Sequence, residues 1–150
     1  MGEARRTIIV HAFDDENAAT GVGFSMSGYG VRGEEIKCSK DKARGNGMGK
    51  DDEHKITFEL ADHTDLELRF PAKQDAMWVS PNDVDCPDCP VHQNDVVTAT
   101  DTSDDGEQLD VINKNKEKKR YKFALNFIDK DGKTHQYDPV WNNQNGGMNR

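Results

Sequence analysis

Residues 121–147 read YKFALNFIDKDGKTHQYDPVWNNQNGG and carry the clearest secondary-structure pattern in the chain. Large apolar side chains occupy every second position in residues 121–127, and aromatic or apolar side chains do so again in residues 137–141. This alternation is typical of strands with one buried face. The DKDG sequence between them predicts a tight turn with a left-handed glycine at Gly132. The stretch therefore predicts an antiparallel hairpin.

The turn fixes the register of this hairpin. A three-residue loop pairs Asp129 with Lys133. Counted on from that pair, Ala124 lies opposite Asp138, and both apolar sets share one face. Lys122 then lies one diagonal step from Asp138, within reach of its long side chain.

The rest of the chain shows further strand patterns and no apolar stripe of helical period. Strands are expected in residues 7–13, 18–30, 31–38, 76–80, 95–100 and 108–113. Residues 54–70 predict a second hairpin, because apolar alternation runs on both sides of an ADHTD turn, and Trp78 is expected to anchor the core. The fold class that follows is all-β: an antiparallel β-sandwich, Greek-key or Ig-like, of roughly eight to ten short strands with little helix.

Length and composition predict one domain. A chain of 150 residues can build a single core, and 33% hydrophobic against 32% charged residues indicates long polar loops. We expect a single β-sandwich domain over residues 1–150, long loops at residues 39–53 and 81–94, and a flexible C-terminal tail at residues 142–150.

Charge and cysteine content limit the partners. A net charge of −8 argues against nucleic acid, because phosphate binding needs a basic surface. No stretch resembles a membrane span, and residues 7–13 are too short for a signal peptide. Three cysteines fit a reducing compartment, so a cytoplasmic protein is expected. The remaining partners are a second copy, another protein, or the chain's own C-terminal segment.

The sequence CPDCPVH contains one candidate metal site. Two thiolates at the spacing of Cys86 and Cys89 form half of a structural zinc site, with His92 as a third ligand. A complete site needs a fourth ligand, and no second CxxC exists. Three interpretations stay open: a zinc-stabilised domain, a local disulfide, and reduced thiols in a proline-stiffened loop. The expectation is no cofactor, with zinc as the alternative.

The chemically unusual bond is Asp138–Pro139. The Asp138 carboxylate can attack its own main-chain carbonyl to give a cyclic anhydride, and the Pro139 nitrogen, a tertiary amide without N–H, leaves once it is protonated. A flexible chain needs strong acid and heat for this reaction. A fold that fixes the geometry can remove roughly 7–11 kcal/mol of the barrier.

Two further side chains are candidates for assisting the bond. Lys122 either forms an ordinary surface ion pair with Asp138, or donates a proton toward Pro139 and, once neutral, captures the anhydride as an isopeptide. The second role requires partial burial, which lowers a pKa that is normally ~10.4. In residues 108–113, alternation turns Asp110 onto the face of Lys122 if the two strands are neighbours. Asp110 would then act through Lys122 or a water, about 10 Å from Asp138.

Residues 121–147 resemble the C-terminal part of the DP-EP family. The likeness covers the aromatic strand, the Asp/Gly turn, the Tyr-Asp-Pro sequence and the Asn/Gly-rich tail, about 27 of the 150 residues. It implies a small bacterial β-sandwich protein that cleaves itself once, as an autocatalytic Asp-Pro endopeptidase, at Asp138–Pro139. The alternative is a non-enzymatic binding or assembly module in which the Asp-Pro bond is inert.

Overall fold

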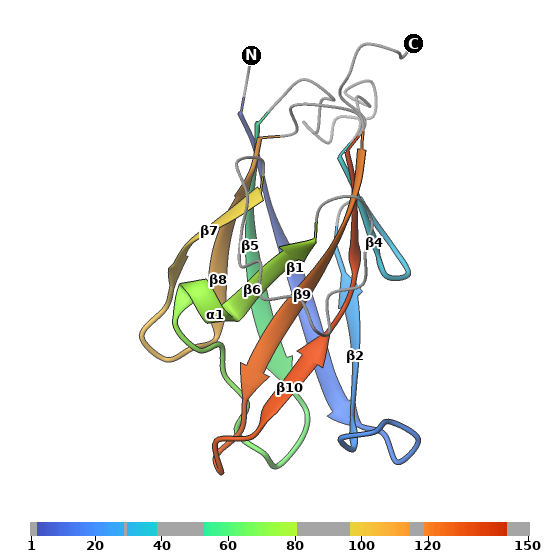
Figure 1. Ribbon diagram of the computed structural model, residues 1–150, viewed down its shortest axis with the longest axis vertical. Coiled ribbons are helices and arrows are strands. Elements are labelled where there is room, and N and C mark those ends of the chain that lie inside the picture. The colour runs from blue at the N-terminus through green and yellow to red at the C-terminus, as the bar shows by residue number, and fades with distance from the viewer. Residues whose placement is uncertain (1–2, 29, 39–52, 81–96, 115–118, 144–150) are drawn as a thin grey trace.

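The computed structural model describes residues 3–28, 30–38, 53–80, 97–114 and 119–143, and these residues are almost entirely β (Figure 1). The strands are β1 (Glu3–Asp14), β2 (Val22–Ser27), β3 (Val31–Arg32), β4 (Glu35–Cys38), β5 (Glu53–Asp62), β6 (Met77–Ser80), β7 (Val97–Thr102), β8 (Gln108–Asn113), β9 (Lys119–Ile128), β10 (Thr134–Tyr137) and β11 (Val140–Asn143). The described residues contain one helical turn, α1 (Lys73–Ala76). The predicted all-β class is confirmed.

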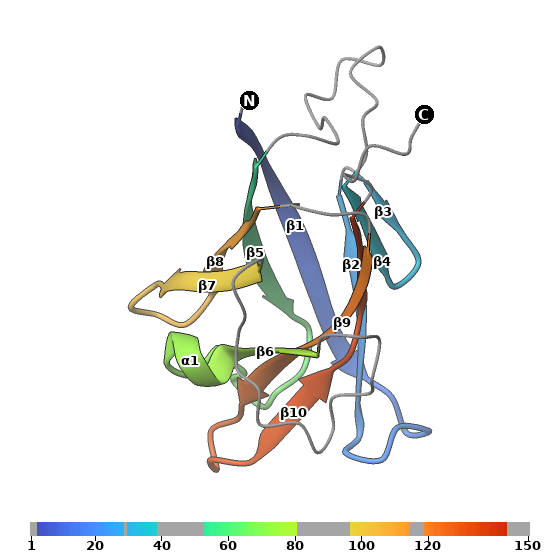
Figure 2. The same cartoon turned by 45° about the horizontal axis from the view of Figure 1, so that its top comes forward.

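The strands form two sheets. Sheet A has the order β2-β1-β5-β8-β7. In sheet B, β10 and β11 both pair with β9, β11 also pairs with β4, and β4 pairs with β3. Strand β6 lies on the other edge of β9. In Figure 1, β9 crosses in front of β1, and Figure 2 shows the same two groups of strands from another direction.

Both sheets are mixed, which corrects the prediction of purely antiparallel pairing. β1 and β5 run parallel over ten residue pairs from Glu3↔Glu53, and β4 and β11 are also parallel. Between β1 and β5 the chain builds β2 in sheet A and then β3 and β4 in sheet B. A connection of that length can return the chain in the same direction, which a tight hairpin turn cannot do.

The second predicted hairpin is wrong. β5 is a strand, but its two edges are filled by β1 and β8, so residues 66–70 cannot pair alongside it. This segment crosses to sheet B instead, where Arg69 and Ile128 exchange two backbone hydrogen bonds of 3.0 and 2.8 Å. Asp62 accepts the Leu68 N–H at 2.9 Å and holds the start of the crossing.

The inner faces of the sheets share one apolar core. Phe58 of β5 lies 6.1 Å from Phe123 of β9 between ring centroids, and Phe24 of β2 lies 5.2 Å from Phe127. Trp78 was expected in this core but is only half-buried, because its neighbours Met77 and Val79 take the inward positions of β6.

The hairpin of β9 and β10 is confirmed. Tyr137 pairs with Leu125, as the three-residue loop requires, and Asp129 N–H donates to the Lys133 carbonyl at 3.0 Å. Gly132 adopts φ +82°, the left-handed conformation that the turn needs. β11 extends to Asn143, two residues into the stretch that was expected to be a tail.

Candidate functional site

The Asp138–Pro139 bond lies between two strands that are held by the same neighbour. β10 pairs with β9 through Tyr137↔Leu125, and β11 resumes the pairing at Val140↔Lys122 in an unchanged register. Between them, Phe123 N–H donates to the Pro139 carbonyl at 3.1 Å. The bond is therefore fixed on both sides against one strand.

Asp138 and Lys122 lie on the outer face of sheet B. Tyr121 and Phe123 are buried in the core, so the alternation of β9 turns Lys122 outward, where it is half-buried. Tyr137 is buried in the same way and turns Asp138 outward, where it is exposed. Since Val140 lies opposite Lys122, Asp138 is its diagonal neighbour, about 7–8 Å away between Cα atoms. The structure thus brings these two predicted site residues together.

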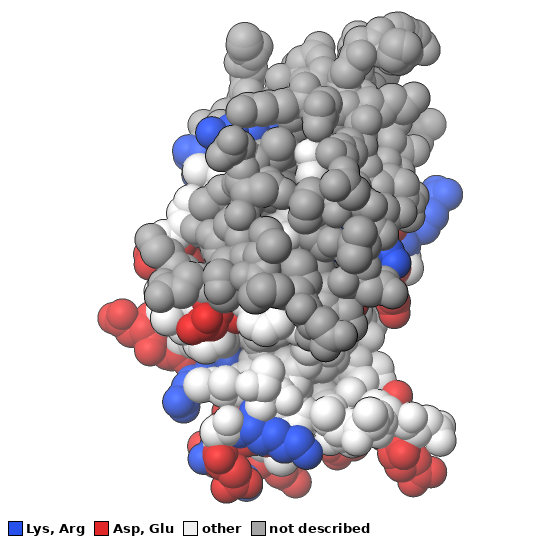
Figure 3. All heavy atoms as spheres, viewed as in Figure 1, with Lys and Arg blue, Asp and Glu red and all other residues white. Residues whose placement is uncertain are grey.

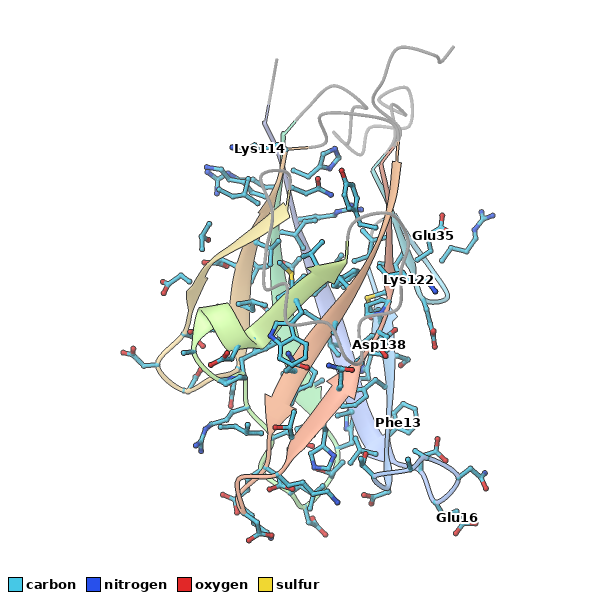
Figure 4. All side chains as sticks on the ribbon, viewed as in Figure 1. Phe13, Glu16, Glu35, Lys114, Lys122 and Asp138 are labelled. Atoms are coloured by element: carbon cyan, nitrogen blue, oxygen red, sulfur yellow. The ribbon has the colours of Figure 1, made fainter. Side chains whose placement is uncertain are left out.

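Glu35 is a third charged residue at this place. β4 runs parallel to β11, and Glu35 lies opposite Val140 on the side away from Lys122. Figure 4 shows Glu35, Lys122 and Asp138 following one another along one side of the molecule. We call Asp138, Lys122 and Glu35 the Asp138 cluster. No sequence pattern indicates Glu35, because residues far apart in the chain meet here through a parallel pairing.

The charges around the cluster alternate in sign. Arg32 of β3 lies opposite Glu35, so the outer face of sheet B carries Arg32, Glu35 and Lys122 in one row, with Asp138 diagonal to the last. On the face drawn in Figure 3 the described acidic and basic side chains are likewise interspersed. A carboxylate at the bond, an ammonium on one side of β11 and a second carboxylate on its other side together suit proton transfer.

The condition for a role of Asp110, that its strand is a neighbour of β9, is not met. β8 lies between β5 and β7 in sheet A, not next to β9. Asp110 faces outward there and accepts a 2.8 Å hydrogen bond from the Thr57 hydroxyl. The inner faces of the two sheets pack on each other, so Asp110 and Lys122 lie on outer faces that point apart.

Asp110 instead helps to line a groove of about 520 Å³ on the outer face of sheet A. The polar side chains around this groove include Arg5, Lys55, Thr57 and Thr100. Hydroxyls and charges of both signs can hold a small polar ligand. The groove is a separate surface from the Asp138 cluster.

The predicted zinc ligands Cys86, Cys89 and His92 lie outside the described residues. Among the residues that the structure describes, no group of three or more His, Cys, Asp or Glu side chains could hold a metal ion. In the same part of the chain, no helix is long and apolar enough to cross a membrane.

Comparison with known proteins gives no match, either to a family model or to a curated protein. The likeness to the DP-EP family stays a prediction from residues 121–147.

Proposed function

We propose that this protein cleaves its own Asp138–Pro139 bond in a single turnover. The observation that carries the proposal is the common register of β10 and β11 on β9, because it fixes the bond and its flanking residues against one strand. Holding reacting groups in place is the main advantage that a folded chain has over a flexible one.

The reaction needs only groups of the chain and water. An Asp138 carboxylate oxygen forms a bond to the main-chain carbonyl carbon of Asp138, and the bond from that carbon to the Pro139 nitrogen breaks. The electron pair stays on the nitrogen, which takes up a proton. Water then opens the cyclic anhydride and leaves residues 1–138 with a C-terminal aspartate. Asp138 is exposed, so water has access to this step.

Lys122 is the proposed proton donor. Its ammonium lies diagonal to Asp138 on the same face and can protonate the departing Pro139 nitrogen. Tyr137, the nearest aromatic hydroxyl along the chain, faces the core instead. There burial, together with the charge of Glu34, raises the pKa of its hydroxyl. Tyr137 therefore stays protonated and lies on the opposite side of the sheet.

The rival is a binding or assembly module with an inert Asp-Pro bond, and the groove beside Asp110 is the observation that favours it. The two functions differ in mass under denaturing conditions. Cleavage predicts two pieces, residues 1–138 and 139–150, whereas the rival predicts the full-length chain alone.

Variants test the assigned roles. Asp138→Ala removes the attacking carboxylate and is expected to abolish cleavage. Lys122→Ala removes the proton donor and is expected to slow cleavage by roughly 10²-fold or more. Lys133→Ala, an exposed lysine in the turn of the same hairpin, is the control and should cleave at the wild-type rate. Cleavage of Asp138→Ala would rule out the anhydride route, and an unaffected Lys122→Ala would remove Lys122 from it.

A further inference from the structure

We propose that Glu35 selects the product of the cleavage, by returning Lys122 to its protonated form before the lysine can attack the anhydride. This inference rests on the proposed self-cleavage. It concerns what becomes of residues 1–138 after the bond has broken. Glu35 is a positioning residue in this step: its carboxylate favours a proton on Lys122, and it does not react itself.

The chemistry creates the choice. When Lys122 gives its proton to the Pro139 nitrogen, it becomes a neutral amine one diagonal step from the new anhydride. That amine can attack the side-chain carbonyl carbon of Asp138. An amide bond then forms, the carbon–oxygen bond of the anhydride breaks, and the main-chain carboxylate and one proton are released. If Lys122 first regains a proton from water, the amine is no longer a nucleophile and water opens the anhydride instead.

Glu35 biases this choice because of where β4 places it. It lies opposite Val140, which itself lies opposite Lys122, so the two side chains flank the same strand on one face. Two strand spacings separate their Cα atoms by about 10 Å, a gap that a lysine and a glutamate can bridge. A carboxylate near an amine favours the protonated form of that amine.

Other charges face the same pair. Asp138 also favours the protonated form of Lys122 until it is consumed in the anhydride, which leaves Glu35 as the carboxylate of the cluster. Arg32 of β3 lies opposite Glu35 of β4. Its positive charge attracts the Glu35 carboxylate and therefore competes with Lys122 for it.

Two variants move the outcome in opposite directions. Glu35→Gln keeps the shape of the side chain but removes its charge, so the cross-linked share of cleaved protein should rise several-fold. The pH at which the cross-linked share reaches half of its maximum should fall by roughly half a pH unit. Arg32→Gln releases Glu35 to act on Lys122 alone and should lower the cross-linked share. Glu16→Gln is the matched control, since Glu16 is exposed and lies at the far end of the molecule (Figure 4).

The experiment is an intact-mass measurement of the full chain and its three variants, denatured after incubation between pH 6 and pH 10. The cross-linked piece 1–138 is lighter by one water than the hydrolysed piece. A higher light fraction in Glu35→Gln, a lower one in Arg32→Gln and no change in Glu16→Gln support the inference. Cleavage with the same product ratio in all four proteins would overturn it and leave the self-cleavage standing. A wild-type chain that never cleaves would overturn both.

Discussion

At the scale of single residues, the turn between β9 and β10 depends on the carboxylate of Asp129. One oxygen accepts the N–H groups of Asp131 and Lys133 at 2.8 and 2.9 Å, and the other accepts the Nε2–H of His135 at 2.9 Å. Both Asp129 and His135 are buried. The hydrogen bond from His135, followed by that from the Lys133 amide, lowers the pKa of Asp129 from 3.8 to about 2.

Because of this carboxylate, the stability of the folded protein depends on pH. Because its folded pKa is below its ordinary value, it stabilises the fold above about pH 4, and the contribution is lost as the pH falls toward 2. Asp129→Asn should lower the urea midpoint at neutral pH and weaken the fall of that midpoint between pH 4 and pH 2. Asp131→Asn, an exposed change in the same loop, serves as the control. Parallel pH curves for wild type and Asp129→Asn would contradict this role.

At the scale of elements, β11 is held on both of its edges. Val140 to Asn143 pair with β9 on one side and with β4 on the other. This strand is therefore the connection between β9 and the β3–β4 hairpin, and the Pro139 carbonyl adds a further hydrogen bond to Phe123.

Cleavage should consequently leave the C-terminal piece in place. Native size-exclusion chromatography is expected to give one particle of wild-type size, from which denaturation releases residues 139–150. The hydrogen bonds on both edges of β11 supply the affinity. Recovery of residues 139–150 as a separate species under native conditions would contradict the role of β11 as a retained strand.

The turn between β7 and β8 is the second element with a specific requirement. Gly106 has φ +73°, its carbonyl accepts the Phe70 N–H at 2.8 Å, and an added Cβ would lie 2.6 Å from the Cβ of Arg69. The crossing segment thus packs directly on this glycine. Gly132 has φ +82°, but a Cβ there would meet no atom within 4 Å.

The two glycines make a matched pair. Gly132→Ala carries only the left-handed strain and should destabilise the protein by roughly 1–2 kcal/mol. Gly106→Ala adds a steric clash with the Arg69 side-chain stem and should lose at least ~1 kcal/mol more. Urea unfolding of both variants measures the difference. Equal losses of stability in the two variants would show that the crossing segment can shift away from Gly106 without cost.

At the scale of the whole molecule, local pattern predicted the strands but not their neighbours. The alternation of residues 121–127 and the DKDG turn determine the β9–β10 register, because a one-residue shift would expose the apolar set. Nothing in β1 or β5 shows that they pair in parallel, since the same alternation suits either direction. The position of Asp110 in sheet A and of Glu35 beside the Asp-Pro bond both follow from strand order, which depends on the packing of distant segments.

The Asp138–Lys122 placement was predictable for the same reason. Both residues belong to one hairpin and its extension, where the turn alone determines which residues face each other. Glu35 could not be found in this way, because most of the chain separates it in sequence from its neighbour in the sheet, β11.

The most direct measurement of the central claim is the mass of the wild-type chain, denatured after prolonged incubation at neutral pH. The account predicts two species, residues 1–138 and residues 139–150, with proline as the amino-terminal residue of the smaller one. A single full-length species after that incubation would contradict self-cleavage and favour the inert binding module.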